Sequence, residues 1–201
     1  MKKGIIISCI LICTVFSAAS AFASPNNHFL ATAGYCTSTY TGEEKTKVSG
    51  LDLGIMYVHD TGKPLSVFVI SSTFLPIISD GELYSGRYET ESFQNTFAGI
   101  AWRVVDSRFK ARLGIGLNLE LLEAERGESE WKRTQLTAGI GTLLNLQYTF
   151  GRHFSICLNG GLSYYFGGIA GTTPYRGEED ARTVKEGKLS ISASIGLGYS
   201  F

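Results

Sequence analysis

Apolar residues alternate with polar or small residues along most of this chain. In the clearest stretch, every second residue from Phe109 to Leu121 is apolar, and Lys, Arg, Gly, Asn and Glu stand between them. A period of two over this length predicts a β-strand and contradicts the helical period. The alternation recurs over 136–150, 154–166 and 189–201, and less regularly over 29–40, 51–57, 65–75 and 93–104. The pattern therefore predicts an all-β chain of eight strands, although it does not settle which face of 65–75 points inward.

The connections between these strands alternate in length. The segments "HDTGK", "VDSR" and "GRH" follow the second, fourth and sixth strands and are tight. Long polar segments follow the odd strands, over about 41–47, 78–91, 122–134 and 168–187. Short turns at one end and long loops at the other are typical of an eight-stranded antiparallel up-and-down barrel. An even number of strands brings both termini to the short-turn end.

The polar face of the last strand indicates what the barrel encloses. That face consists of Ser and Gly alone, at Ser190, Ser192, Ser194, Gly196, Gly198 and Ser200. A soluble barrel of lipocalin type is the alternative, but its water-exposed face would normally carry Lys and Glu. Small uncharged side chains instead suit the narrow interior of an eight-stranded barrel whose apolar face meets lipid.

Aromatic residues support a transmembrane barrel because they collect near both ends of the strands. Two such girdles are what the two bilayer interfaces select. Near the short turns the apolar face carries Tyr57, Trp102, Phe150, Phe154, Tyr199 and Phe201, and near the long loops Phe74, Tyr164 and Phe166.

The N-terminus has the features of an exported protein. Lys2 and Lys3 precede a short apolar run, and small residues end in Ala21-Phe22-Ala23. This pattern predicts a cleaved signal peptide at 1–23 and an outer-membrane barrel domain at 24–201. Cys9 and Cys13 raise a lipoprotein alternative, but Cys9 comes too early in the apolar run, and Cys13 follows the bulky Ile12 where lipoprotein processing needs a small residue.

Composition excludes several classes of function. Lys and Arg together number 18 and so do Asp and Glu, so no basic excess points to nucleic acid. Cys36 and Cys157 would remain after cleavage and fall on strands that are not neighbours, so we expect no disulfide. We expect no cofactor and no metal site.

Three segments resemble the Ail/Lom family of small outer-membrane proteins, to which OmpX and PagC belong. "SGLDLGIMYVHDTGKPLSVFVISSTF" resembles its second strand, first turn and third strand, and "AGIAWRVVDSRF" its fourth strand and second turn. The C-terminal "SASIGLGYSF" is similar to the signal that the barrel assembly machinery recognises in most such barrels, here Gly196, Tyr199 and Phe201. The match is poor between 127 and 188. The resemblance implies a location in the outer membrane, among its lipids and lipopolysaccharide, with periplasmic termini. It also implies roles in adhesion, invasion or resistance to host complement, that is, in virulence.

Five charged residues are predicted to point into the barrel. They could line a conducting constriction, or they could form a structural network that plugs a lumen too narrow to conduct, and the barrel's size favours the plug. Buried charges need partners, so each should be paired or hydrated. The residues are Asp52, Arg103, Lys110, Arg112 and Glu120.

Some small barrels act on lipid A through a catalytic His beside a Ser at the outer rim. His28, His59 and His153 are all predicted at the periplasmic end, which is the wrong end for such a site. We therefore predict no enzyme and no catalytic residue, and interpret the three as solvated turn histidines.

The long loops hold most of the acidic residues and several exposed aromatics. A solvated rim of mixed charge is the simplest interpretation, but aromatics and Arg also dominate binding interfaces. We therefore predict a monomeric surface protein that binds host-surface or matrix components through its loops, with β-augmentation on long strand ends as one mode. The alternative is a structural or small-pore barrel without a protein ligand. The candidate binding residues are Tyr84, Arg87, Tyr88, Trp131, Lys132, Arg133, Tyr175 and Arg176.

Overall fold

The computed structural model describes residues 26–41, 46–61, 64–83, 90–126, 131–173, 180–184 and 187–201. Several strand ends at the long-loop end are described by their backbone alone. The predicted signal peptide lies outside these residues and stays a prediction. Within the described ranges, no helix is long and apolar enough to cross a membrane.

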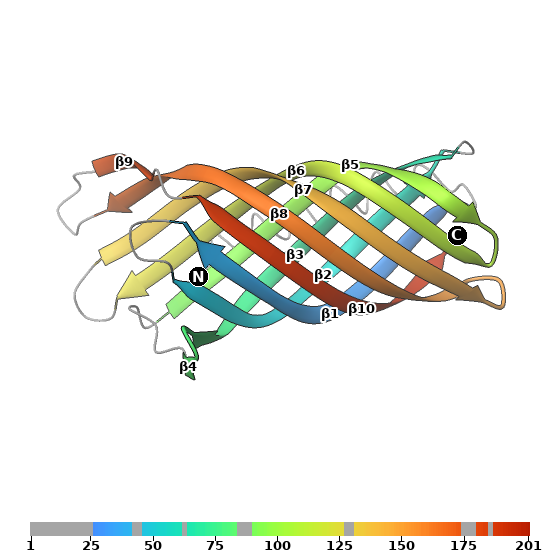
Figure 1. The fold of residues 1–201 in the computed structure, drawn as a ribbon, viewed down its shortest axis with the longest axis horizontal. Helices are drawn as coiled ribbons and strands as arrows, with labels where there is room; N and C mark the ends of the chain where they lie inside the picture. Colours follow the sequence, from blue (N-terminus) through green and yellow to red (C-terminus); the bar gives the residue numbers. More distant parts are fainter. Residues whose placement is uncertain are drawn as a thin grey trace.

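Eight long antiparallel strands close into a barrel (Figure 1). They follow one another around the wall in chain order, and β10 pairs with both β1 and β8, which closes the sheet. The predicted up-and-down barrel is therefore confirmed. The long strands are β1 (Asn27–Tyr40), β2 (Lys47–Asp60), β3 (Leu65–Ser79), β5 (Thr90–Asp106), β6 (Phe109–Arg126), β7 (Trp131–Phe150), β8 (Phe154–Thr173) and β10 (Lys188–Ser200), and two short strands are β4 (Glu82–Leu83) and β9 (Asp180–Val184).

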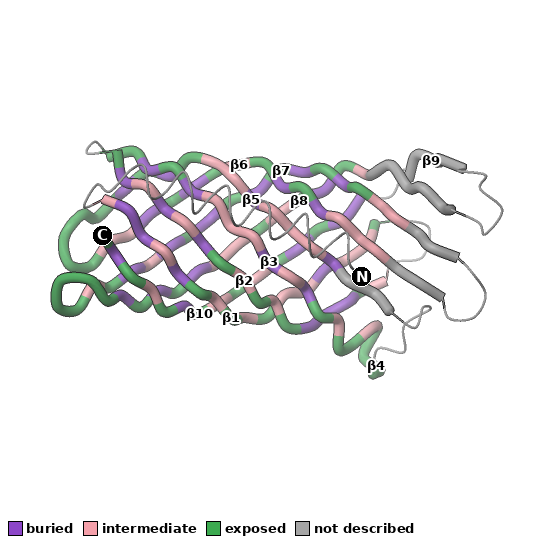
Figure 2. Tube along the Cα trace, turned by 180° about the vertical axis from the view of Figure 1, so that it is seen from behind, coloured by how far each residue is buried: buried purple, intermediate pink, exposed green. Residues whose placement is uncertain are grey.

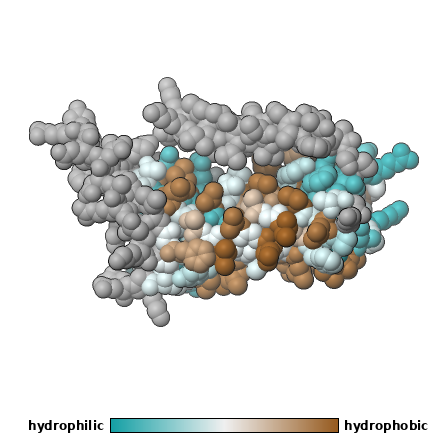
Figure 3. Space-filling view, turned by 90° about the horizontal axis from the view of Figure 1, so that it is seen from above, coloured by the Kyte–Doolittle hydropathy of each residue, from teal (hydrophilic) through white to brown (hydrophobic). Residues whose placement is uncertain are grey.

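The apolar faces of the strands point outward. Ile195 and Leu197 expose 68% and 71% of their surface, whereas Arg112 and Gln147 inside the barrel expose none. Buried and exposed residues alternate along the strands in Figure 2, and Figure 3 shows apolar side chains gathered on the outer wall. A water-soluble barrel would show the reverse distribution. The predicted assignment of inside and outside is confirmed.

Glycines let neighbouring strands approach closely at one height of the wall. Gly99, Gly116 and Gly141 stand side by side across β5, β6 and β7. A methyl group added to Gly99 would lie 2.1 Å from the carbonyl oxygen of Ile115. Such a separation is far inside van der Waals contact, so Gly99 requires a residue without a Cβ, and so does Gly116, where an added Cβ would lie 2.3 Å from the Ala98 carbonyl oxygen.

The interior holds two apolar clusters. The larger, here the central cluster, consists of Leu30, Met56, Val58, Phe68, Phe97, Ala101, Leu143 and Cys157. The smaller, here the mouth cluster, lies toward the long loops and consists of Val48, Phe74 and Phe93 with Cys36, Tyr40 and Leu122 packed against them. Both cysteines are free, as expected.

The third strand, whose orientation the sequence left undecided, directs Ser66, Phe68, Ser72 and Phe74 inward. The assignment of Phe74 to the outer aromatic girdle was therefore wrong. Its ring instead packs edge-on against Phe93 inside the barrel, with centroids 5.6 Å apart.

The aromatic girdle at the short-turn end is confirmed. Phe154, Phe201 and Trp102 are each more than half exposed on the outer wall. Tyr199 contacts Phe154 and Phe201 at ring-centroid distances of 5.7 and 5.1 Å. Tyr199 and Phe201 of the predicted assembly signal thus lie in the girdle, whereas Gly196 faces inward against Cys157.

Strands at the long-loop end continue further than predicted. β6 reaches Arg126, β7 starts at Trp131 and β8 reaches Thr173, so most of the predicted loop at 122–134 is strand. The predicted loop at 78–91 contains a tight hairpin that joins β3 to β4. Its two turn residues, Asp80 and Gly81, have φ values of 51° and 90°, which an Asp-Gly pair favours.

Candidate functional site

A buried carboxylate organises the barrel interior at the short-turn end. Asp60, the last residue of β2, has no exposed surface. It accepts hydrogen bonds from Lys110 Nζ at 2.7 Å and from Arg112 Nη2 at 2.9 Å. The hydroxyl of Ser66 donates to its other oxygen at 2.6 Å, and Arg103 Nη1 lies 3.7 Å away. One carboxylate therefore faces three cationic side chains, which makes it the centre of the network.

His28 and Gln147 extend this network around the wall. His28 Nε2 lies 3.0 Å from Asp60, and His28 Nδ1 lies 2.6 Å from the hydroxyl of Ser200. Arg112 also donates to Gln147 at 2.8 Å and to Asn145 at 2.7 Å.

Asn145 donates to Asn159 on β8 at 2.7 Å. Together with these contacts, the network includes side chains from all eight long strands. The side chains at this end of the barrel therefore depend on one another, and we call this set the Asp60 network.

Sequence analysis found part of the Asp60 network. Arg103, Lys110 and Arg112 point inward as predicted, and all three lie around Asp60. Asp60 itself was placed in a turn. Its position could have been found, because extending the inward face of the second strand in steps of two from Asp52 leads to Asp60.

The interpretation of the histidines needs correction. His28 is only 3% exposed, because it continues the inward face of β1 beyond Leu30. His59 is partly buried and lies 2.7 Å from the side-chain oxygen of Asn27. His153 alone is exposed in its turn, where it stacks on Tyr199.

The other two predicted interior charges lie nearer the long loops. Glu120 pairs with Lys188, a residue the sequence analysis did not select, although it stands on the inward face of the last strand. The Lys188 ammonium also lies 4.3 Å from the ring centroid of Tyr165. Asp52 lies beside Ser72 inside the barrel. The five predicted residues therefore belong to separate groups at different heights of the barrel.

Buried side chains form successive layers along the described part of the lumen. The Asp60 network, the central cluster, the Lys188–Glu120 pair and the mouth cluster follow one another toward the long loops. Arg112, Phe68, Met56 and Tyr165 have 1% or less of their surface accessible, so these layers contain large side chains that are packed on all sides.

We expect the purified barrel to show no steady ion conductance in planar bilayers. The reason is that a permeating ion would have to break buried hydrogen bonds or cross apolar layers. Single-channel recording tests this expectation, with a known porin in the same lipid as the positive control. A reproducible ohmic conductance would show that the lumen opens and would favour the small-pore alternative.

Five strands continue beyond the mouth of the barrel as one sheet. Thr90 of β5 pairs with Glu125 of β6, which pairs with Lys132 of β7. Lys132 in turn pairs with Thr173 of β8, and β8 pairs with β9. Beyond the cross-strand pair Leu121–Leu136, the last large apolar pair of this hairpin, the register continues for five further pairs, or about 17 Å. We call the part of β5–β9 beyond this pair the protruding sheet.

The predicted binding residues divide between this sheet and segments outside the described residues. The backbone of Trp131, Lys132 and Arg133 forms the start of β7 in the protruding sheet. The other five, Tyr84, Arg87, Tyr88, Tyr175 and Arg176, lie outside the described residues.

Solved structures similar to this one are outer-membrane or surface barrels. Neisserial surface protein A matches with a TM-score of 0.58 and 15% identity, over 86% of this chain and 97% of the other. The outer-membrane protein OprG of Pseudomonas aeruginosa matches with a TM-score of 0.58 and 16% identity, over 88% and 96%. The fold is that of the eight-stranded outer-membrane barrels.

The fold type that the Ail/Lom resemblance implied is thus confirmed. Ail of Yersinia pestis is a weaker match, with a TM-score of 0.40 and 13% identity over 86% of this chain and 99% of the other, and adds nothing to this conclusion. No family model matches the sequence, and neither does any curated protein. At these identities the comparisons establish the fold of this barrel.

Proposed function

We propose that this barrel is a surface protein of the outer membrane that binds host or matrix components through its long-loop end. In this orientation the short turns and both termini face the periplasm. The layers of buried side chains inside the barrel support the proposal, because they favour the exposed ends over the lumen as the surfaces for function. The observation that carries it is the protruding sheet, since its strands extend past the apolar belt that a bilayer would cover.

β-Augmentation is the binding mode that suits the protruding sheet. Among the described residues, β9 pairs with β8 alone, so its other edge has no strand partner there. An extended segment of another protein can add to such an edge through main-chain hydrogen bonds, and side chains then supply specificity. Trp131, Lys132 and Arg133 belong to the same sheet, and an aromatic beside cations is typical of interface anchors.

Trimming β9 tests the proposal. A short Gly-Ser turn replaces residues 174–186, and intact cells displaying the protein are applied to epithelial monolayers and to immobilised basement-membrane matrix. We expect binding well above that of cells lacking the barrel, and its loss in the trimmed variant. Trp131→Ala should weaken binding by about 30-fold if it is an interface anchor.

The matched control trims residues 42–45 between β1 and β2, two strands that are not part of the protruding sheet. Heat-modifiable migration on gels confirms folding of each variant, and protease shaving of intact cells tests the orientation. Binding that is absent in the parent, or unchanged after removal of 174–186, would contradict the proposal. Either result would favour the structural barrel without a protein ligand.

A further inference from the structure

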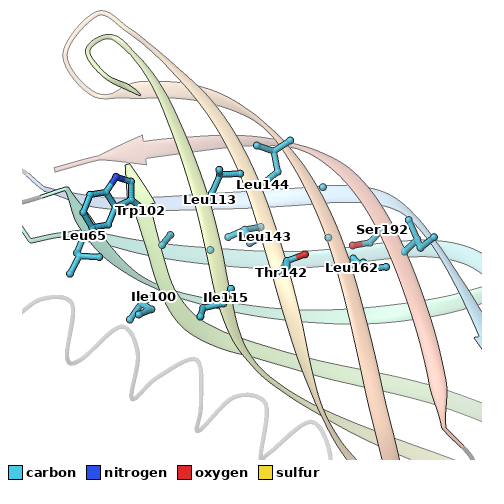
Figure 4. A pocket seen from close by; sticks show the side chains of 15 residues that line it. Leu65, Ile100, Trp102, Leu113, Ile115, Thr142, Leu143, Leu144, Leu162 and Ser192 are labelled. Carbon is cyan, nitrogen blue, oxygen red and sulfur yellow. The ribbon is translucent and has the colours of Figure 1, made fainter. Parts of the chain in front are cut away.

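A groove of about 720 Å³ crosses the outer wall of the barrel (Figure 4). Two rows of outward side chains form its sides. Trp102, Leu113 and Leu144 belong to one row, which runs across β5, β6 and β7 and ends at Gly160 on β8. The second row contains Ile100, Ile115, Thr142, Leu162 and Ile191.

Gly160 hollows the wall at one end of the groove. A Cβ added there would meet only the Cβ of Leu144, at 4.0 Å. This contrasts with Gly99 or Gly116, where an added Cβ would lie within 2.3 Å of a neighbouring carbonyl oxygen. Glycine at position 160 is therefore not required by close packing of strands, and its effect is to leave space on the lipid-facing side.

The end of the groove at Trp102 and Leu113 lies near the short turns, in the membrane leaflet on that side of the barrel. Along β6, the outward residues between Leu113 and the turn are Ala111 and Phe109. The five residues from Leu113 to Arg108 span about 17 Å along the strand, or about 13 Å of depth at a tilt of about 40°. By the same arithmetic Gly160, eight residues from Arg152, lies about 21 Å deep. Half of a bilayer with its headgroups is also about 21 Å thick, so an acyl chain whose phosphate lies at the turns can follow the groove from Leu113 and end near Gly160 within its own leaflet.

Two exposed arginines stand at that end of the wall. Arg108 lies in the turn between β5 and β6, and Arg152 lies in the turn between β7 and β8. The turns are neighbours, because the Thr149 amide donates to the Arg108 carbonyl at 2.8 Å. Asp106, the carboxylate nearest in sequence, is engaged by Arg103 at 2.9 Å. Among the described residues no ion-pair partner occupies either Arg108 or Arg152.

We propose that the groove and these two arginines form a binding site for one glycerophospholipid of the leaflet at the short-turn end. An acyl chain lies in the groove, and the phosphate lies between Arg108 and Arg152. Guanidinium groups bind phosphate oxygens through strong, charge-assisted hydrogen bonds. A second copy of the chain fits this face less well. Two copies side by side in one membrane would place Arg108 and Arg152 of both copies at the same depth, where their like charges repel.

Native mass spectrometry of the full-length protein, extracted in mild detergent, tests the proposal. We expect one co-purifying phospholipid per barrel, identified by its mass and so distinguished from lipid A. After delipidation, titration with phosphatidylglycerol should restore the bound species. Arg108→Gln with Arg152→Gln should weaken this binding by tenfold or more, as expected for lost charged hydrogen bonds.

Gly160→Leu tests the groove separately from the arginines, because its side chain fills the hollow. It should also reduce the bound phospholipid at least tenfold. Ala33→Leu is its matched control, as an outward small residue on β1 away from the groove, and Lys47→Gln is the control for removal of a cation at the opposite end. Heat-modifiable migration checks that Gly160→Leu is folded, and the arginine variant decides the question if it is not.

Three results would overturn this site. The first is a parent protein without bound phospholipid, and the second is equal loss in the test and control variants. The third is a protein dimer in place of the lipid adduct, which would assign the groove to a second copy. None of these results bears on binding by the protruding sheet, whose test uses intact cells and the opposite end of the barrel.

Discussion

Replacing Asp60 with asparagine is expected to lower the free energy of unfolding by about 3–5 kcal/mol, as for other broken buried ion pairs. The substitution keeps the shape of the side chain but removes its charge. Arg112, which is fully buried, would lose the carboxylate that lies 2.9 Å from its guanidinium, and Lys110 would lose one at 2.7 Å. Most of the cost comes from desolvated cations left without a counter-charge, because their attraction to Asp60 offsets the loss of water in the native barrel.

Equilibrium unfolding in urea, in detergent micelles or lipid vesicles, measures the loss. Asp106→Asn is the matched control, because Asp106 is about half exposed and forms an ion pair with Arg103 at 2.9 Å. Its removal should cost at most about 1 kcal/mol. Adding Arg112→Met to Asp60→Asn should recover part of the stability, since that removes the largest uncompensated charge. Equal effects of the two Asn variants would show that Asp60 is not the centre of the network.

Gly99→Ala, which adds one methyl group, is expected to prevent normal closure of the barrel wall or to lower the free energy of unfolding by about 3 kcal/mol. This value is the upper end of the range for overpacking. The methyl carbon would lie 2.1 Å from the Ile115 carbonyl oxygen and 2.6 Å from the Gly116 Cα. Both atoms are backbone, so no side-chain rotation relieves the contact. β5 and β6 would have to separate, with loss of ladder hydrogen bonds.

Gly160→Ala is the control for this prediction, because it makes the same chemical change on the same sheet. Its methyl group enters open space, and removing a glycine also restricts the unfolded chain, so its stability should equal or slightly exceed that of the parent. Two measurements compare the variants. The heat-modifiable band on gels gives the refolding yield, and the midpoint of urea unfolding gives the stability. If Gly99→Ala refolds as well as Gly160→Ala, the close approach of β5 and β6 is not a requirement of the fold.

The strand pattern was predictable because the membrane imposes it on every residue. Lipid outside and a narrow lumen inside select opposite side chains at alternate positions, so the stretch from Phe109 to Leu121 shows its two faces without any tertiary information. The inward face of the third strand could not be assigned from alternation, because Phe68 and Phe74 make that face apolar as well. Those rings fill space left by glycines and small residues on other strands, and one strand's sequence does not reveal such compensation.

The candidate sites were predictable to different degrees. Arg103, Lys110 and Arg112 could be assigned to the interior from alternation alone. Asp60 and His28 were missed because they stand at the ends of strands, where the boundary between strand and turn is hard to place from sequence. The groove at Gly160 and the five-stranded extension beyond the mouth depend on which strands are neighbours and in what register.

The sequence by itself thus determined the class of the molecule: an antiparallel barrel of eight strands, apolar outside and small or polar inside, with short turns at one end. Only the tertiary structure decided how the interior is filled, since partners such as His28 and Ser200 are 172 positions apart in the chain. The physical reason is that alternation is a local consequence of the two solvents on either side of the wall. Pairing of buried charges, approach of glycine backbones and hollows in the wall arise only when barrel closure fixes the register between distant strands.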